Sequence, residues 1–121
     1  MDALSLLLRA DIPNQPEKEY KHKRLSTLCG EPVILKIKAL PYNRAAELIK
    51  SQMDDLNVHI VLAGMVDPNL KDKDLMAKYG AETPAELVKK MFLPGEVEDL
   101  SRAIEKLSGY REVTVEEIKK K

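Results

Sequence analysis

The sequence has few of the residues that build disulfide scaffolds, metal sites or aromatic anchors. Its 121 residues include one cysteine, one phenylalanine, four tyrosines and no tryptophan. The single cysteine, Cys29, excludes an internal disulfide framework and a cysteine-based zinc site, and it indicates a reducing compartment. The shortage of aromatic side chains argues against a tight, permanent interface, where such anchors are common.

An excess of one charge is also missing, because 20 Lys and Arg balance 20 Asp and Glu. The chain therefore lacks the basic excess from which nucleic-acid and anionic-membrane binders draw their affinity. No run approaches the ~20 apolar residues of a membrane span, and residues 1–4 lack the basic start of a signal peptide. We expect a soluble cytoplasmic protein that binds neither membranes nor nucleic acid. A hydrophobic content of 44% is enough for one folded domain.

Residues 1–16 are predicted to form an N-terminal arm. Asp2 is a candidate N-cap for two helical turns in which Leu4, Leu7 and Leu8 share one face. So short a helix is marginal unless it docks on something. Because two prolines follow, and an amphipathic segment before a proline linker often docks in a groove of a partner or second subunit, these leucines are the predicted partner-binding residues. Docking on the protein's own core is an equally weighted alternative.

Residues 17–121 are predicted to form a single domain that begins with a β-hairpin. Strand-like runs cover residues 17–26 and 33–40, with a turn signal containing Gly and Pro at 29–32. In the second run lysines alternate with apolar residues, as on a strand with one buried face. A hairpin alone is marginal in water, so it must pack against helices.

The rest of the chain has helical patterning. Helices are predicted at about 41–53, 56–66, 70–79, 83–93, 95–109 and from 114 to the C-terminus. The segment 56–66 is almost continuously apolar, and periodicity does not separate a helix from a buried strand there; we favour a helix. Thr83 and Thr114 each precede a glutamate by three residues, which is the capping-box pattern of a helix start. The predicted fold class is α+β, mainly helical, with an N-terminal β-hairpin packed against five or six short helices.

No group of residues in the sequence predicts catalysis or metal binding. His22 and His59 have no neighbours with metal-ligand spacing. Ser26 and Cys29 are isolated potential nucleophiles without a base placed by the sequence. We therefore predict a protein that is not an enzyme and needs no cofactor or metal.

One basic cluster, residues 18–24, has two interpretations. In a strand, Lys18, Tyr20, His22 and Arg24 would share one face. That face would be either the charged edge that prevents sheet-to-sheet aggregation or a small nucleic-acid-binding stripe. The absence of basic charge elsewhere favours the edge.

Several segments, taken in order and spacing, resemble one family. They are Lys23–Ser26, Gly30–Pro32, Ile37–Leu40, Asp67–Asp72, Lys78–Ala81, Thr83–Val88, Leu93–Val97, Leu107–Tyr110 and Glu116–Lys119. Together the sequence resembles phage tail assembly chaperones of the XkdN-like kind, found with contractile-tailed phages and defective prophages. The resemblance spans most of the chain and includes little of residues 1–16.

The resemblance implies a protein of the infected bacterial cytoplasm that is absent from the finished virion. Such a chaperone would hold the long, hydrophobic tape measure protein soluble and help tail tube subunits assemble around it. Many tails also have a longer form of this protein, made by programmed ribosomal frameshifting near the end of the gene. The lysines at 119–121 suggest a slippery A-rich run. The shorter form would then have its own longer form as a further partner, and homo-oligomers are another possibility. The alternative function is a small virion structural or nucleic-acid-associated phage protein that uses the basic strand 18–24.

Overall fold

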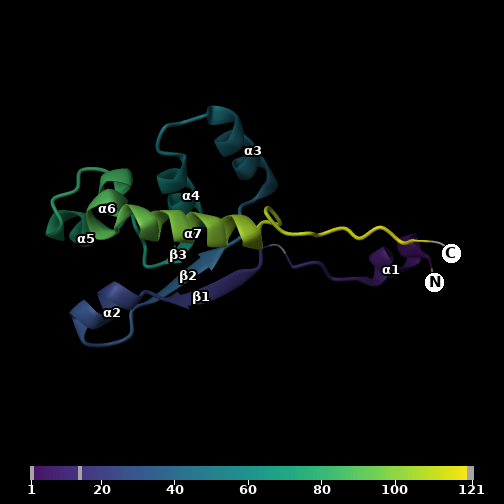
Figure 1. Cartoon of the computed structure of the whole chain (residues 1–121), viewed down its shortest axis with the longest axis horizontal. Helices are drawn as coiled ribbons and strands as arrows, with labels where there is room; N and C mark the ends of the chain where they lie inside the picture. The colour runs from purple at the N-terminus through teal and green to yellow at the C-terminus, as the bar shows by residue number, and fades with distance from the viewer. Residues whose placement is uncertain (1, 14, 120–121) are drawn as a thin grey trace.

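The computed structural model describes residues 2–13 and 15–119 (Figure 1). Over these residues the fold is α+β and mainly helical, as predicted, with a small three-stranded antiparallel sheet. The elements in chain order are α1 (Ala3–Arg9), β1 (Glu17–Lys21), α2 (Lys23–Cys29), β2 (Ile34–Lys38), α3 (Tyr42–Ser51), α4 (Leu56–Gly64), β3 (Met65–Asp67), α5 (Lys73–Lys78), α6 (Pro84–Met91) and α7 (Pro94–Leu107). Within the described residues no helix is long and apolar enough to cross a membrane.

The predicted hairpin is only partly right, because β1 ends at Lys21 and a helix follows it. His22 caps that helix: its Nδ1 accepts a hydrogen bond from the Leu25 amide at 3.1 Å. Gly30 ends α2 in the left-handed conformation (φ 74°), which glycine adopts without strain. The expected strand 17–26 is therefore wrong after residue 21, where local capping overrides the alternating pattern.

The sheet also has a strand that the sequence analysis did not predict. The predicted helix at 56–66 is confirmed as α4, but it ends at Gly64, and β3 follows at once. β3 pairs with β2, with Lys36 opposite Asp67, so the strand order is β1-β2-β3. Three residues are too few for a period of two to be recognised in the sequence. β3 forms because the end of α4 lies next to the edge of β2.

The helix boundaries in the middle of the chain follow capping chemistry. Asp72 accepts a hydrogen bond from the Leu75 amide at 2.9 Å and starts α5. Thr83 accepts one from the Glu86 amide at 3.1 Å and starts α6, as predicted. The Glu86 carboxylate, however, accepts from the amide of Glu82 instead of closing a capping box with Thr83.

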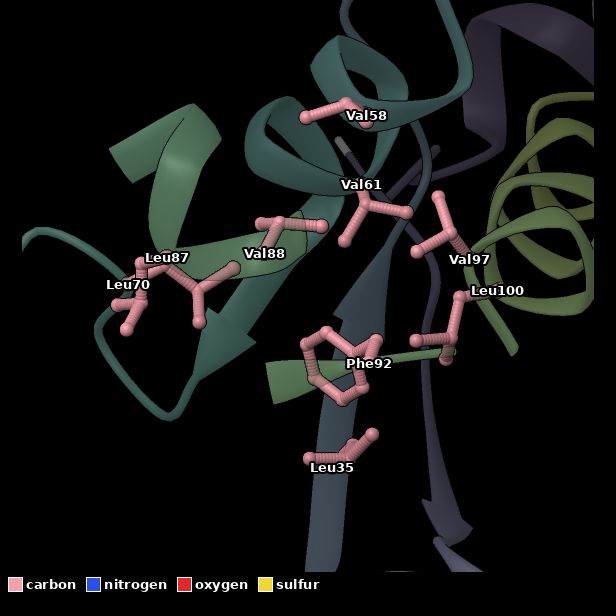
Figure 2. Packing of buried hydrophobic residues seen from close by; sticks show 9 residues of the cluster. All are labelled: Leu35, Val58, Val61, Leu70, Leu87, Val88, Phe92, Val97 and Leu100. Atoms are coloured by element: carbon pink, nitrogen blue, oxygen red, sulfur yellow. The ribbon is translucent and has the colours of Figure 1, made fainter. Parts of the chain in front are cut away.

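Two apolar clusters hold the body together. The larger one joins the sheet to α4, α6 and α7, and Figure 2 shows its side chains converging between these elements; its buried members are Leu35, Val58, Val61, Leu70, Leu87, Val88, Phe92, Val97 and Leu100. The second cluster lies between the sheet, α3, α4 and α7 and contains Ile37, Leu40, Ala45, Leu48, Ile60 and Ile104. Each fully buried aliphatic side chain contributes about 1.5–3 kcal/mol relative to an exposed one, so these clusters account for most of the stabilisation of the body.

The predicted C-terminal helix is wrong. Residues 113–119 have no regular secondary structure, and Val113, Val115 and Ile118 are 94%, 83% and 84% exposed. A capping box contributes only about 1 kcal/mol. A helix of two turns cannot form on that basis when no apolar face packs against a neighbour.

Candidate partner-binding surfaces

The predicted partner-binding leucines lie on a formed helix whose side chains are not buried by the rest of the described chain. Asp2 caps α1 by accepting a hydrogen bond from the Ser5 amide at 3.0 Å, and this bond lowers the pKa of its carboxyl group. Leu4, Leu7 and Leu8 are 66%, 62% and 77% exposed. α1 contains no buried residue. The exposed leucines suit a helix that is covered when a partner binds. In the structure α1 does not dock on the protein's own core, which was the alternative.

The other end of the chain exposes a second apolar segment, which we call the C-terminal tail (residues 112–119). Figure 1 shows the tail and α1 leaving the body at the same end of its long axis. Its exposed apolar residues are Val113, Val115 and Ile118. This surface was not predicted, because Thr114 and Glu117 have the pattern of a helix start. The adjacent β-branched residues, Val-Thr-Val, were the signal for an extended chain.

A third surface is the outer edge of β1. β1 pairs with β2 alone within the described chain, and all five of its residues are exposed. An unpaired edge carries free N–H and C=O groups to which another strand can pair. Charged side chains are present on this edge, as the sequence analysis expected.

A pocket of about 350 Å³ lies between β1 and α7. The first turn of α2 closes one side, and the buried side chain of Leu35 belongs to its lining. The residues that line it are Tyr20, Lys21, His22, Lys23, Arg24, Leu35, Glu96, Asp99, Leu100 and Ala103. The pocket thus has apolar parts from β2 and α7 and a charged rim, and it borders the unpaired strand.

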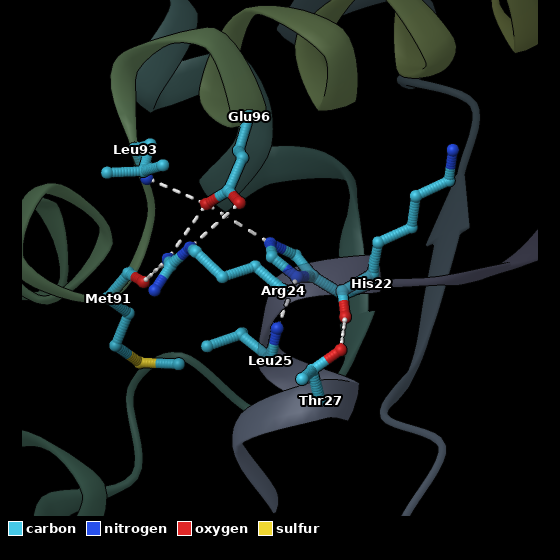
Figure 3. A network of polar contacts seen from close by, with 8 residues as sticks. His22, Arg24, Leu25, Thr27, Met91, Leu93 and Glu96 are labelled. Carbon is cyan, nitrogen blue, oxygen red and sulfur yellow. Dashed lines mark hydrogen bonds and ion pairs between the residues drawn. The ribbon is translucent and has the colours of Figure 1, made fainter.

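One wall of this pocket is a polar network that joins α2 to the start of α7 (Figure 3). The Arg24 guanidinium donates to both carboxylate oxygens of Glu96, at 3.0 and 2.9 Å, and to the Met91 carbonyl at 2.8 Å. Glu96 also accepts the Leu93 amide at 2.8 Å, which satisfies a free N–H at the start of α7. The hydrogen bonds from Arg24 are the main cause that lowers the pKa of Glu96 to about 2; burial acts in the opposite direction.

His22 completes the network and has a structural role. Its side chain is buried, its ring lies 5.5 Å from the ring of Phe92, and its Nε2 lies 3.2 Å from a Glu96 oxygen. That contact is not aligned as a hydrogen bond, since Nε2 has no hydrogen-bond partner among the described residues. Because Nδ1 caps α2, the ring is held in place between helix and core.

This geometry corrects the expected basic strand at 18–24. His22 and Arg24 lie beyond β1, so Lys18, Tyr20, His22 and Arg24 do not form one strand face. Arg24 is occupied by Glu96. The basic groups left on the surface are Lys18, Lys21 and Lys23, none of which makes an ion pair within the described residues.

The remaining residues singled out from the sequence are not brought together. His59 Nε2 lies 3.5 Å from Asp55 on the same helix end, and Lys89 pairs with the same carboxylate. Ser26 is buried and accepts the Val33 amide at 2.8 Å, whereas Cys29 is exposed. In the described part of the chain, no three His, Cys, Asp or Glu residues are grouped as metal ligands would be.

Comparison with known proteins identifies the family. The family model of the phage XkdN-like tail assembly chaperone protein matches residues 50–119, which are 70 of the 121 residues. Among solved structures, the crystal structure of the protein yqbn is similar over 91% of this chain and 98% of that chain, with 25% identity and a TM-score of 0.70. No curated protein matches the chain. The match confirms the resemblance found in the sequence: the chain belongs to the family of phage XkdN-like tail assembly chaperones.

Proposed function

We propose that the protein binds the tape measure protein in the host bacterial cytoplasm and keeps it soluble while the tail tube forms around it. The protein then leaves and is absent from the virion. Family membership supports a role in tail assembly and a role that is not enzymatic. The observation that carries the step to a bound partner is α1, a capped helix whose leucines are all exposed.

The chemistry of α1 suits a long, helical, hydrophobic partner. Leu4, Leu7 and Leu8 recur at helical spacing, which is how one helix presents a stripe to another. The described chain offers no groove that α1 fills. A neutral protein with modest apolar patches binds reversibly, and a chaperone that must release its client needs reversible binding.

Affinity capture tests the proposal. The tagged full chain is recovered at moderate salt from bacteria in which the phage has been induced, and the captured proteins and purified tails are analysed by mass spectrometry. We expect the tape measure protein in the captured fraction, and no copies of this chain in the tail. Tail tube protein or a longer frameshifted form in the same fraction would extend the partner set. Stoichiometric presence in the tail would contradict the proposal.

Two matched triple variants locate the binding surface. Leu4→Ser, Leu7→Ser and Leu8→Ser together remove the stripe of α1, and we expect at least a tenfold loss of captured tape measure protein. Val113→Ser, Val115→Ser and Ile118→Ser remove as many exposed apolar side chains from the tail and should preserve capture. Equal capture by both variants would exclude α1 as the binding surface.

The alternative of nucleic-acid binding is tested in the same lysate. Binding through Lys18, Lys21 and Lys23 would weaken steeply with salt, because phosphate contacts release counterions. We expect capture to depend only mildly on salt and to resist nuclease treatment.

A further inference from the structure

We propose that the C-terminal tail of one copy pairs with the open edge of β1 in a second copy, adding a fourth strand to its sheet. This inference concerns self-association and is independent of tape measure binding. It rests on the backbone of β1, the neighbouring pocket, and the pattern and charge of the tail.

The backbone of β1 is arranged to accept a strand. At the two ends of the β1–β2 ladder, the His22 amide donates to the Val33 carbonyl and the Ala39 amide donates to the Pro16 carbonyl, each at 2.9 Å. Since antiparallel pairs alternate between bonded and non-bonded positions, the even-numbered residues of β1 bond to β2. The backbone groups that face the open edge are those of Glu17, Glu19 and Lys21.

The side-chain alternation of β1 places the pocket beside the added strand. Lys18 and Tyr20 are opposite Ile37 and Leu35, whose side chains are buried, so they lie on the sheet face that is covered by α7. Tyr20 lines the pocket between β1 and α7. Alternate side chains of an incoming strand therefore point toward this pocket, as in other complexes where a peptide extends a sheet.

The tail has the matching pattern. Val113 and Val115 share one face of an extended chain, and β-branched residues suit strands. Both side chains are almost fully exposed. Pairing with β1 buries them against Tyr20 and the apolar side of the pocket, and an aromatic–β-branched cross-strand pair is stabilising.

Charge complementarity points to this occupant. Lys18, Lys21 and Lys23 surround the open edge, and Glu112, Glu116 and Glu117 lie in the tail. Within the described residues none of the six makes an ion pair. With Lys119 counted, the tail has a net charge of −2, and with Glu17 and Glu19 counted, residues 17–23 have a net charge of +1, so the two segments are oppositely charged.

An antiparallel register fits these features. With Val115 opposite Tyr20, Glu117 lies opposite Lys18. The like-charged pair in this register is Glu116 with Glu19, and Lys36 of β2 is the register partner of Glu19 on its other side. Replacing Glu116 by lysine should therefore strengthen the association.

The direction of the tail favours a second copy over the same chain. Ser108 accepts the Leu40 amide at 2.9 Å, and Ala39 bonds to Pro16, so the tail starts near the first residue of β1. From there, a tail folding back on its own sheet would run parallel to β1. The tail instead leads away from the body (Figure 1), and the antiparallel direction is available to a tail from another molecule.

Sedimentation equilibrium of the full chain without tape measure protein tests the association. The Cys29→Ser background prevents adventitious disulfides. We expect the mean mass to rise from 13.7 kDa toward twice that value as the concentration approaches millimolar at low salt. A chain that stays monomeric throughout would overturn the proposal.

Two variants of equal charge test which tail face is used. Val113→Lys with Val115→Lys should lower the association constant at least tenfold, because charged side chains replace the two apolar ones that are buried against Tyr20 and the apolar side of the pocket. Glu116→Gln with Ile118→Lys makes the same change in charge on the opposite face, next to Glu17 and Glu19, and should preserve association. Equal behaviour of the two variants would overturn the assignment. Circular dichroism checks that each variant keeps the fold.

Disulfide formation distinguishes the source of the tail. In the Cys29→Ser background, chains with Lys18→Cys are mixed with chains with Glu117→Cys. We expect disulfide-linked heterodimers to form at least ten times faster in this mixture than in a control mixture. In the control, chains with Asn43→Cys, an exposed position on α3, replace the chains with Lys18→Cys. A chain with both cysteines that forms its disulfide within one molecule at micromolar concentration would show pairing within the chain and overturn the proposal.

Discussion

The body and the terminal segments of this protein use the same kinds of aliphatic residues for opposite purposes. In the body, Ile37, Leu87 and Ile104 are completely buried between sheet and helices. In α1 and the C-terminal tail, leucines, valines and an isoleucine at similar density are mostly in solvent. Apolar content alone therefore does not identify the core of this chain. What distinguishes the two regions is whether another element lies opposite the apolar face.

The largest effect is expected from a cavity in the body. Ile104 is fully buried at the contact between α4 and α7, so Ile104→Ala should lower the free energy of unfolding by about 2–5 kcal/mol. Urea denaturation measures this loss of free energy. Leu8→Ala in α1 is the matched control and should change stability by less than about 0.5 kcal/mol. Similar losses for both variants would remove the contrast between body and termini.

Overpacking at the same contact should cost somewhat less. A Cβ on Gly64 would lie 2.6 Å from Ile104 Cδ1, and Gly64→Ala should lower stability by about 1–3 kcal/mol. Because the two residues touch, the double variant with Ile104→Ala should be more stable than the sum of the single losses predicts. Strict additivity, measured in the same urea titrations, would show that the contact is not tight.

The Arg24–Glu96 network should make the body sensitive to acid. The pKa of Glu96 is lowered from 4.5 to about 2 in the folded protein. Its contribution is therefore complete above pH 4.5 and is lost as the pH falls toward 2. After allowance for solvent screening we expect a loss on the order of 2 kcal/mol. Glu96→Gln should flatten this part of the pH profile of unfolding, whereas Glu116→Gln in the tail should leave it unchanged.

The smallest effect on stability is expected from the termini. The triple serine variants of α1 and of the tail should each change the free energy of unfolding by less than about 0.5 kcal/mol, since none of the replaced side chains is buried. Their effects belong to binding: tape measure capture for α1 and self-association for the tail. A change of more than about 1 kcal/mol in the free energy of unfolding of either variant would show that the segment packs on the body.

Sequence patterns were sufficient at several helix starts and along the apolar faces of helices that pack on the body. Asp2 and Thr83 were expected at helix starts and cap α1 and α6. The helix predicted at about 95–109 is present as α7, and its buried face includes Val97, Leu100 and Ile104.

The errors occurred where two local signals competed or where a partner element decides the outcome. Residues 22–26 alternate like a strand, but the ring nitrogen of His22 caps a helix instead. Thr114 has the pattern of a cap, but no apolar neighbour holds a helix after it. Among the candidate surfaces, the leucines of α1 and a charged edge strand were predicted from the sequence, whereas the pocket beside that edge was not.

By itself the sequence determined the fold class and most of the helices, because amphipathic periodicity and capping act over a few residues. It also identified the family, through the resemblance of several segments in order and spacing. Only the tertiary structure decided that β3 completes the sheet, that Arg24 is bound to Glu96 rather than free, and that no element within residues 2–13 and 15–119 covers either terminal segment. Those outcomes depend on contacts between residues far apart in the chain. Their free energy is gained only when the elements meet.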